Sequence, residues 1–314
     1  MKVVIPAAGL GKRLQPMTYF YPKPLLYIGR KRMIDYIMDS IEGIVISEII
    51  MVVGYKGKML EDYLRENYKY NFTFVYQEKQ AGLGDAVLMG IEGSAHPERE
   101  DLLVLLSDTI IDADMKKFTK RGRTKIAVKS VNNPKLFGII ETDGKKITGM
   151  TEKPENPKSD MAIVGLYYFS NIKSIQSSLE YVKNSGVRTK NEFQLTDAMI
   201  HLMEAGEDME PFCLKNWIDC GNFEMLIDSN KELLKRNKLK NYSENASIED
   251  SQLKGNVSLF ENSSVKNSKL KNTIVFPNAV IEDCTLHDSV IGEECVIKNF
   301  KGKIICSGKT IINK

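Results

Sequence analysis

Short apolar runs alternate with amphipathic segments through the first three quarters of the chain. The runs are rich in Val, Ile and Leu and have the length of buried strands, at residues 3–5, 49–53, 72–76, 102–106 and 126–128. The segments between them with apolar residues at helical spacing are 33–44, 58–67 and 83–91. This alternation predicts an α/β domain with a mostly parallel mixed sheet, helices on both faces and ligands at the carboxyl ends of the strands.

A different pattern begins near residue 237, after a charged stretch that indicates a helix end and a connector. Four similar segments are headed by Ile248, Val265, Ile281 and Ile297, which lie 17, 16 and 16 residues apart. A leucine follows five residues behind each of the first three heads. Such a repeat predicts short coils that stack to cover their apolar faces, with a plain antiparallel sheet as the alternative. We therefore expect two domains, 1–236 and 237–314.

Composition narrows the classes of function. The net charge of +3, with 27% charged residues among 314, argues against a dedicated nucleic-acid binder. No apolar run approaches the roughly 20 residues of a membrane span. The five cysteines are odd in number and contain no C-x-x-C pair, which favours neither zinc nor disulfides. We expect a cytoplasmic protein that binds neither membrane nor nucleic acid.

The first apolar run leads into a basic, glycine-containing loop with Gly9, Gly11 and Arg13, and Lys23 follows ten residues after Arg13. A loop of this kind after a strand presents backbone N–H groups and cations to phosphate, so we expect a bound nucleotide. It is not a P-loop, because no G-K-[ST] occurs at the required spacing. It is not a dinucleotide fingerprint either, because Leu14 occupies the place of the third small residue.

Eight short motifs, in order, resemble the sugar-1-phosphate nucleotidyltransferases, also called NDP-sugar pyrophosphorylases. The resemblance is closest to the glucose-1-phosphate thymidylyl- and uridylyltransferases that carry a C-terminal hexapeptide-repeat β-helix. The motifs are the G-x-G-x-R…P-x-T…K-P region at 9–24, Q-x-x-x-x-G-L at 77–83, L-S-D at 106–108, F-G at 137–138, E-K-P at 152–154, V-G-L-Y at 164–167, E-F-Q-L-T-D at 192–197 and W-I-D-C-G at 217–221. The resemblance implies a Rossmann-like nucleotidyltransferase domain followed by a short left-handed parallel β-helix.

The resemblance also implies the reaction. A sugar-1-phosphate oxygen attacks the α-phosphorus of a nucleoside triphosphate and releases pyrophosphate, so the protein must position two anions and neutralise their charge. Arg13 and Lys23 are the implied catalytic cations, and the Arg13 guanidinium can hold two oxygens at once. Asp108 and Asp219, each after an apolar run, are the implied ligands of Mg²⁺. A turn or a helix cap is the structural alternative for such aspartates.

Two further groups of residues follow from the resemblance. The implied nucleotide-binding residues are Ala8, Gly9, Gly11, Gln77 and Gly82. The Gln77 amide offers the donor and acceptor that complement the edge of uracil or thymine. The implied sugar-phosphate-binding residues are Gly138, Glu152, Lys153 and Gly165. Without the resemblance, the E-K-P segment reads as a surface turn. The acidic groups of the 192–197 motif fit helix caps, so this motif is left outside the expected site.

Several alternatives stay open at this point. The sequence does not decide between UTP and dTTP, and N-acetylglucosamine-1-phosphate or mannose-1-phosphate could replace glucose-1-phosphate as the acceptor. A non-catalytic regulatory relative is a further alternative, although Arg13, Lys23, Asp108, Lys153 and Asp219 are all present. A bifunctional enzyme with an acetyltransferase tail is disfavoured by the short repeat. We expect a homo-oligomer, because about four coils suffice for packing or oligomer contacts.

Overall fold

The computed structural model describes residues 1–94 and 100–314. Contacts divide the chain into two compact units. Unit 1 comprises Met1–Gly9 and Ile37–Trp217, and unit 2 comprises Leu10–Tyr36 and Ile218–Lys314. The segment Leu10–Tyr36, which carries Arg13 and Lys23, therefore belongs to the same unit as the C-terminal repeats. The domain boundary at 236/237 stays a prediction from the sequence.

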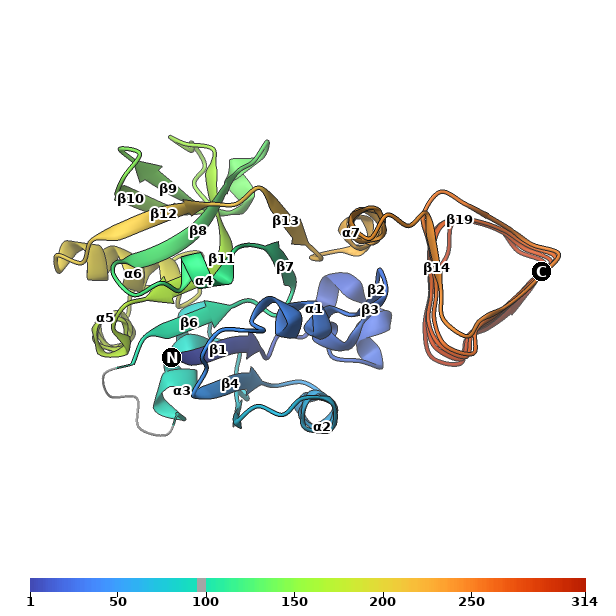
Figure 1. Cartoon of the computed structure of the whole chain (residues 1–314), viewed down its shortest axis with the longest axis horizontal. Coiled ribbons are helices and arrows are strands. Elements are labelled where there is room, and N and C mark those ends of the chain that lie inside the picture. Colours follow the sequence, from blue (N-terminus) through green and yellow to red (C-terminus); the bar gives the residue numbers. More distant parts are fainter. Residues whose placement is uncertain (95–99) are drawn as a thin grey trace. The chain divides into compact units, whose positions relative to one another are not determined.

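Unit 1 is built on a nine-stranded mixed sheet (Figure 1). Its parallel part runs in the order β6 (Leu102–Leu105), β1 (Lys2–Ala7), β4 (Glu48–Val53) and β5 (Phe72–Tyr76). The sheet continues through β11 (Met161–Phe169), which pairs antiparallel with β6, β9 (Gly138–Thr142) and β8 (Thr124–Ser130). Strand β9 also pairs antiparallel with β10 (Ile147–Glu152). Strand β12 (Met209–Cys213) pairs in parallel with β8. The α/β fold with a mixed sheet is confirmed, and all five expected strands form within two residues of their expected ends.

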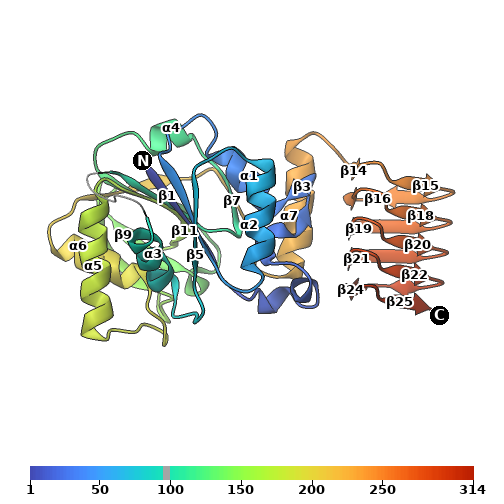
Figure 2. The same cartoon turned by 90° about the horizontal axis from the view of Figure 1, so that it is seen from below.

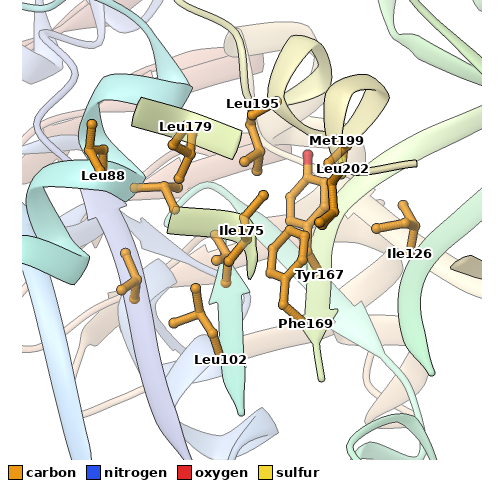
Figure 3. Packing of buried hydrophobic residues seen from close by; sticks show 14 of the residues in the cluster. Leu88, Leu102, Ile126, Tyr167, Phe169, Ile175, Leu179, Leu195, Met199 and Leu202 are labelled. Carbon is orange, nitrogen blue, oxygen red and sulfur yellow. The ribbon is translucent and has the colours of Figure 1, made fainter. Parts of the chain in front are cut away.

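The helices of unit 1 cover the sheet with apolar faces. They are α2 (Gly57–Asn67), α3 (Leu83–Glu92), the short α4 (Met115–Phe118), α5 (Ile172–Ser185) and α6 (Leu195–Glu204). Leu88 of α3, Leu179 of α5 and Met199 of α6 meet strand residues in one buried cluster (Figure 3). The helix expected over 33–44 is shorter, because α1 (Met33–Ser40) ends before the turn that contains Gly43 at φ +77°. No helix of the described chain is both long and apolar enough to cross a membrane.

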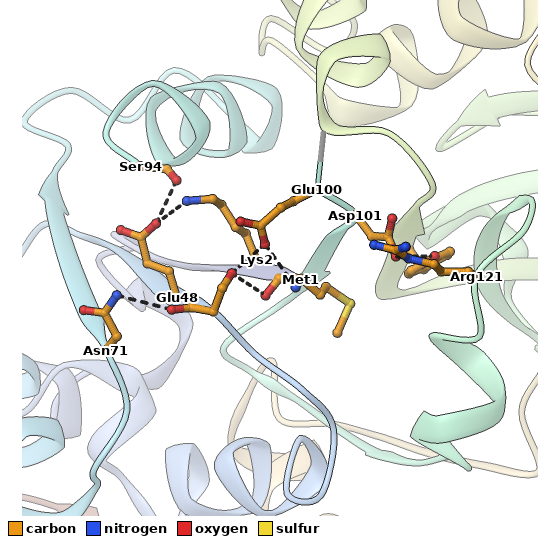
Figure 4. Close-up of polar contacts among 10 residues, drawn as sticks. Met1, Lys2, Glu48, Asn71, Ser94, Glu100, Asp101 and Arg121 are labelled. Carbon is orange, nitrogen blue, oxygen red and sulfur yellow. Dashed lines mark hydrogen bonds and ion pairs between the residues drawn. The ribbon is translucent and has the colours of Figure 1, made fainter. Parts of the chain in front are cut away.

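One ion pair is buried inside the sheet of unit 1. Lys2 and Glu48 are register partners on β1 and β4, and Lys2 Nζ lies 2.6 Å from Glu48 Oε2 (Figure 4). Both side chains are 3% exposed, and hydroxyls of Thr73 and Ser94 also donate to the Glu48 carboxylate. Burial alone would raise the pKa of Glu48, but the bonds from Lys2, Thr73 and Ser94 outweigh it and lower that pKa.

Unit 2 contains a parallel β-helix whose short strands stack in register from coil to coil (Figure 2). One five-stranded sheet consists of β15 (Ser247–Glu249), β18 (Ser264–Lys266), β20 (Val280–Glu282), β22 (Val296–Lys298) and β25 (Ile311–Asn313). The other strands are β14 (Asn241–Ser243), β16 (Gln252–Lys254), β17 (Val257–Leu259), β19 (Lys269–Val275), β21 (Thr285–Ile291), β23 (Lys301–Gly302) and β24 (Ile305–Cys306). Their parallel pairing excludes the antiparallel alternative and is the pairing of the expected left-handed parallel β-helix.

The expected repeat positions coincide with the stacking. Ile248, Val265, Ile281 and Ile297 are register partners along the five-stranded sheet, and Ile312 continues the row. The second row passes through the three leucines and ends at Gly302. Left-handed residues recur every five or six positions, where Asn and Asp are the residues that tolerate this conformation best. They include Asn262, Asn267, Asn272, Asn278, Asp283, Asp288, Glu294 and Asn299.

Unit 2 also contains helix α7 (Phe223–Arg236) and the segment Leu10–Tyr36 (Figure 1). Helix α7 contacts both this segment and the β-helix. The segment contains three 3-10 turns, Lys12–Leu14, Met17–Tyr19 and Lys23–Leu25, and a small hairpin of β2 (Tyr27–Ile28) and β3 (Lys31–Arg32). Asn230 of α7 accepts the Gly29 N–H at 2.7 Å, and Ser258 Oγ lies within hydrogen-bond distance of both Gly29 O and Asn230 Oδ1.

Candidate functional site

In unit 1 the expected base-reading glutamine lies in a polar group at the carboxyl end of β1 and β4. We call Ala8, Gln77, Gln80, Gly82 and Asp85 the Gln77 cluster. Gln77 Nε2 donates to Asp85 Oδ2 at 2.7 Å, and Gln80 Nε2 donates to Ala8 O at 2.7 Å. A carboxylate only accepts, so Asp85 fixes which end of the Gln77 amide is the NH₂ group. The Gln77 side chain is buried and therefore held in one orientation.

Gly82 occupies a backbone position in the Gln77 cluster that only glycine fits. Its φ is +120°, and a Cβ there would lie 2.4 Å from Phe193 O. The hydrogen bonds from Phe193 N to Ala81 O and from Gly84 N to Phe193 O, both 2.8 Å, hold this loop against the 192–197 motif. The glycine is thus required by the close approach of two chain segments, independently of any ligand.

A second group in unit 1 surrounds Glu152. We call Phe137, Gly138, Glu152, Lys153 and Thr196 the Glu152 cluster. Thr196 Oγ1 donates to Glu152 Oε2 at 2.7 Å, and Lys153 Nζ lies 3.6 Å from Glu152 Oε1. A Cβ at Gly138 would lie 2.9 Å from Glu152 Oε2, so glycine makes room for the carboxylate. The structure thus brings together three motifs that are far apart in the sequence.

The Lys153 backbone has an uncommon conformation for a residue with a side chain. Its φ is +43°, in the left-handed region, and its N–H donates to Phe137 O at 3.1 Å. The Lys153 side chain is 48% exposed, whereas that of Glu152 is 10% exposed. The backbone of Lys153 is thus held by a neighbouring motif in a conformation that residues with a side chain seldom adopt.

Tyr167 links the Glu152 cluster electrostatically to Asp108. The buried Tyr167 phenol has its pKa raised by burial first, and the Glu152 and Asp108 carboxylates raise it further. Asp108 directly precedes β7 (Thr109–Asp112) and accepts a 3.3 Å hydrogen bond from Thr109 Oγ1. Gly165 lies at the bulge in β11, where its carbonyl accepts the Leu106 N–H at 2.9 Å.

The exposed Gly9 belongs to unit 1, whereas Gly11, Arg13 and Lys23 belong to unit 2. Gly11 has φ +62° and accepts a 3.0 Å hydrogen bond from Thr18 Oγ1, which closes the loop that carries Arg13. The Arg13 side chain is exposed, and Lys23 is half-buried at the start of a 3-10 turn. Both cations therefore lie in a segment whose shape is stabilised by the contacts of unit 2.

Asp219 ends β13 (Asn216–Asp219), three residues before the N-cap of α7. That cap is Asn222, whose side chain accepts the Met225 N–H at 2.9 Å. Asp219 is therefore not the cap of this helix, and its carbonyl accepts a bond from Ser229 Oγ. Among the described residues, no group of three or more His, Cys, Asp or Glu side chains could hold a metal ion.

Asp85, Gln80 and Thr196 are polar residues that the sequence interpretation did not include. Asp85 lies in the first turn of α3 and Thr196 in the first turn of α6, where acidic and hydroxyl groups ordinarily cap helices. The cap interpretation is wrong for Asp197, because Gln194 is the N-cap residue of α6 and Asp197 accepts from Thr189 Oγ1 instead. The signal for Thr196 was its place within a recognised motif.

Comparison with known proteins adds an independent finding. The family model described as nucleotidyl transferase matches residues 2–236. A protein named bifunctional protein GlmU from Methanocaldococcus jannaschii is 32% identical over 236 residues, which cover 74% of this chain and 54% of that protein. A glucose-1-phosphate thymidylyltransferase from Streptomyces antibioticus is 27% identical over 302 residues, covering 93% and 81%. The chain thus spans about half the length of the first relative.

Two solved structures share the fold. One is titled a putative glucose-1-phosphate thymidylyltransferase from Bacillus anthracis in complex with a sucrose; it is 25% identical with a TM-score of 0.64 and covers 74% of this chain and 95% of that chain. The other is titled UDP-glucose pyrophosphorylase complexed with UDP-glucose; it is 26% identical with a TM-score of 0.65, covering 75% and 98%.

Proposed function

The chain belongs to the nucleotidyl transferase family, and we propose that it transfers a nucleotidyl group from UTP or dTTP to a sugar-1-phosphate, releasing pyrophosphate. Glucose-1-phosphate is the first-choice acceptor, because one relative is named for this substrate and one solved structure of the fold holds UDP-glucose. The observation that carries the proposal is the Glu152 cluster, which places a hydrogen-bond acceptor and a cation side by side on one motif.

The Gln77 cluster supports a pyrimidine base. With one N–H of Gln77 bound to Asp85, the amide keeps its carbonyl oxygen and a second N–H for a ligand. This pair matches the N3–H donor and the O4 acceptor that uracil and thymine share. Ala8, Gly9 and Gly82 are the residues whose backbone we propose to contact the nucleotide. The choice between the two bases stays open.

The Glu152 cluster supports the acceptor substrate. Lys153 binds the phosphate of the sugar-1-phosphate, and Glu152 Oε1, which lies 3.6 Å from Lys153 Nζ, accepts from ring hydroxyls. Gly138 and Gly165 offer backbone groups to the sugar and the ribose. These roles require that the carboxylate be oriented before the sugar arrives, because a site built to hydrogen-bond hydroxyls discriminates only when its own groups are fixed.

The reaction itself needs positioning and charge neutralisation. The acceptor phosphate attacks the α-phosphorus, a bond forms between them, and the bond to the β-phosphate breaks with pyrophosphate as the leaving group. Arg13 holds two oxygens of the triphosphate, and Lys23 adds a second positive charge. Both stabilise negative charge as it moves to the leaving group. No covalent intermediate with the protein is required.

Mg²⁺ fits the donors that the chain offers. This ion takes one or two carboxylates and completes its shell with phosphate and water oxygens, so a cluster of three protein ligands is not needed. Asp108 and Asp219 are the carboxylates that we propose as ligands, and the bound ion would neutralise phosphate charge.

We also propose that the protein is cytoplasmic and forms a homo-oligomer. Analytical ultracentrifugation tests the oligomeric state.

The test is pyrophosphate release with Mg²⁺, measured for four nucleoside triphosphates against three sugar-1-phosphates. The expected result is turnover confined to a pyrimidine triphosphate, strongest with glucose-1-phosphate. If turnover occurs only with N-acetylglucosamine-1-phosphate or only with mannose-1-phosphate, that compound is the acceptor in place of glucose-1-phosphate. A folded protein inactive in every combination would contradict the proposed reaction and favour a regulatory relative.

A further inference from the structure

Four consecutive residues in unit 1 touch both clusters of the candidate site. They are Phe193–Thr196, at the entrance to α6. Phe193 is 1% exposed and Thr196 is 6% exposed, so the segment is buried at both ends. Gln194 between them is extended and buried, and its Nε2 donates to Glu192 Oε2 at 3.0 Å. The segment passes from the extended Gln194 into the first turn of α6, and its buried side chains leave little freedom to move one end without the other.

At its first residue the segment holds the loop of the Gln77 cluster. Phe193 exchanges two 2.8 Å backbone hydrogen bonds with Ala81 and Gly84. A Cβ on Gly84 would lie 2.7 Å from the Phe193 ring, so the ring is packed directly on the first turn of α3. The same turn carries Asp85, which orients Gln77. The position of Phe193 is therefore tied to the position of the base-reading amide.

At its last residue the segment holds the carboxylate of the Glu152 cluster. The Thr196 hydroxyl donates to Glu152 Oε2 at 2.7 Å, the length of a strong hydrogen bond to a charged acceptor. Gly138 leaves room for the same oxygen, since a Cβ there would lie 2.9 Å from Glu152 Oε2. Lys153 lies near the other oxygen, Oε1, so the two oxygens have different neighbours and the carboxylate has a defined rotation.

We propose that Thr196 is a positioning residue that orients Glu152 for the sugar, and that the Phe193–Thr196 segment keeps this carboxylate in register with the nucleotide loop. The inference rests on the proposed function, because it deepens the role of Glu152 there. Thr196 acts through Glu152 and needs no contact with substrate. Without its hydroxyl, Glu152 turns toward the Lys153 ammonium, and both groups are then poorly placed for a sugar-1-phosphate.

The test compares Thr196→Val, which keeps the shape and removes the hydroxyl, with Thr196→Ser, which keeps the hydroxyl. Losing a hydrogen bond to a charged group is expected to raise KM for glucose-1-phosphate about tenfold or more in Thr196→Val. KM for the triphosphate should stay within about twofold, because Phe193 and the loop are intact. Thr196→Ser should restore most of the acceptor affinity. A purely structural role would affect both substrates alike.

The chain offers a matched control in Thr189→Val. Thr189 Oγ1 donates to the Asp197 carboxylate at 2.8 Å, so this variant also removes a threonine–carboxylate bond beside α6 but leaves Glu152 untouched. We expect its acceptor KM to match that of the wild-type protein. Equal losses in Thr189→Val and Thr196→Val, wild-type kinetics in Thr196→Val, or no rescue by Thr196→Ser would each overturn the inference.

Calorimetric titration with glucose-1-phosphate separates this inference from the proposed reaction. Binding that is weakened in Thr196→Val and restored in Thr196→Ser supports the positioning role even if the wild-type protein makes no product. If the wild-type protein turns over and Thr196→Val binds glucose-1-phosphate as tightly as the wild type does, the proposed reaction stands and the positioning role is rejected. If Thr196→Val fails to fold, Thr196→Ala also removes the hydroxyl, together with the γ-methyl group of the threonine, and is compared with Thr196→Ser in the same way.

Discussion

The two units hold their expected site residues by different means. In unit 1, single side-chain bonds orient individual groups, as Asp85 does for Gln77 and Thr196 for Glu152. In unit 2, the segment with Arg13 is attached to a repetitive β-helix through aromatic packing: the Tyr27 ring centroid lies 4.6 Å from that of Phe260. Under the proposed function, recognition of base and sugar would depend on single side-chain bonds in unit 1, whereas the placement of Arg13 and Lys23 would depend on the scaffold of unit 2.

A second comparison takes one ion pair from each unit. The Lys2–Glu48 pair of unit 1 and the Lys298–Glu282 pair of unit 2 have the same 2.6 Å separation. The first pair is buried in the sheet, and the second lies on the surface of the β-helix with side chains 41% and 31% exposed. Only the buried pair loses its water on folding, so only there does each partner depend on the other.

The largest expected effect is on the stability of unit 1. Lys2→Met leaves Glu48 buried without its cation, which should lower the free energy of unfolding by about 3–5 kcal/mol in chemical denaturation. Lys298→Met, with the same separation on the surface, should change it little. Comparable losses in the two variants would break the contrast between the units.

The pH dependence of the first variant has a definite sign. Because the folded pKa of Glu48 is lowered, the wild-type protein gains stability from Glu48 above its unfolded pKa and loses it as the pH falls through the folded value. In Lys2→Met the carboxylate becomes the costly form, so protonation relieves the damage. The difference between variant and wild type should therefore shrink between pH 8 and pH 4, and a constant difference would reject this explanation.

The next effect concerns the cation that unit 2 supplies. Arg13→Ala should lower kcat/KM at least about 100-fold, the scale of losing one preorganised electrostatic donor. Arg13→Lys keeps the charge but not the paired donors, so its kcat/KM should lie between that of Arg13→Ala and that of the wild-type protein. Steady-state kinetics on folded protein provides the measurement, and near-normal turnover of Arg13→Ala would remove this residue from the mechanism.

The smallest effect tests the scaffold itself. Ser258→Ala leaves buried acceptors at Gly29 and Asn230 without a hydroxyl, which should cost about 1–3 kcal/mol of stability and lower kcat/KM a few-fold. Ser268→Ala removes another buried serine. Its hydroxyl donates to Lys266 O and accepts the Cys284 N–H, both within the β-helix. The Ser268→Ala variant should lose stability but keep the kcat/KM of the wild-type protein. Equal kinetics for the two variants would show that the segment with Arg13 does not depend on this contact.

Much of the fold was predictable because its patterns are periodic. The rows from Ile248 and from Leu253 repeat every coil, and each coil can hide its core only against an equivalent neighbour. The parallel strands β1, β4 and β6 were predictable because they are buried along almost their whole length and are therefore nearly continuously apolar, whereas β5 at the edge is half-buried. β11 was not predicted as a strand: its V-G-L-Y letters indicated only a family motif, and the bulge at Gly165 interrupts its pairing.

The candidate site was less predictable than the fold. Motif letters pointed to Gln77 and Glu152, and their roles remain proposals. The residues that hold them were missed, because a hydrogen bond between Thr196 and Glu152 joins positions 44 residues apart and has no periodic trace in the sequence. The grouping of Leu10–Tyr36 with the β-helix was missed for the same reason: Ser258 and Gly29 lie 229 residues apart.

The most direct test of the central claim is phosphorus NMR of the wild-type protein with Mg²⁺, glucose-1-phosphate and UTP or dTTP. The account predicts a new pair of coupled diphosphate resonances from an NDP-sugar, together with an equal amount of pyrophosphate. Orthophosphate as the only product, or unchanged substrates in the presence of folded protein, would contradict nucleotidyl transfer to this acceptor.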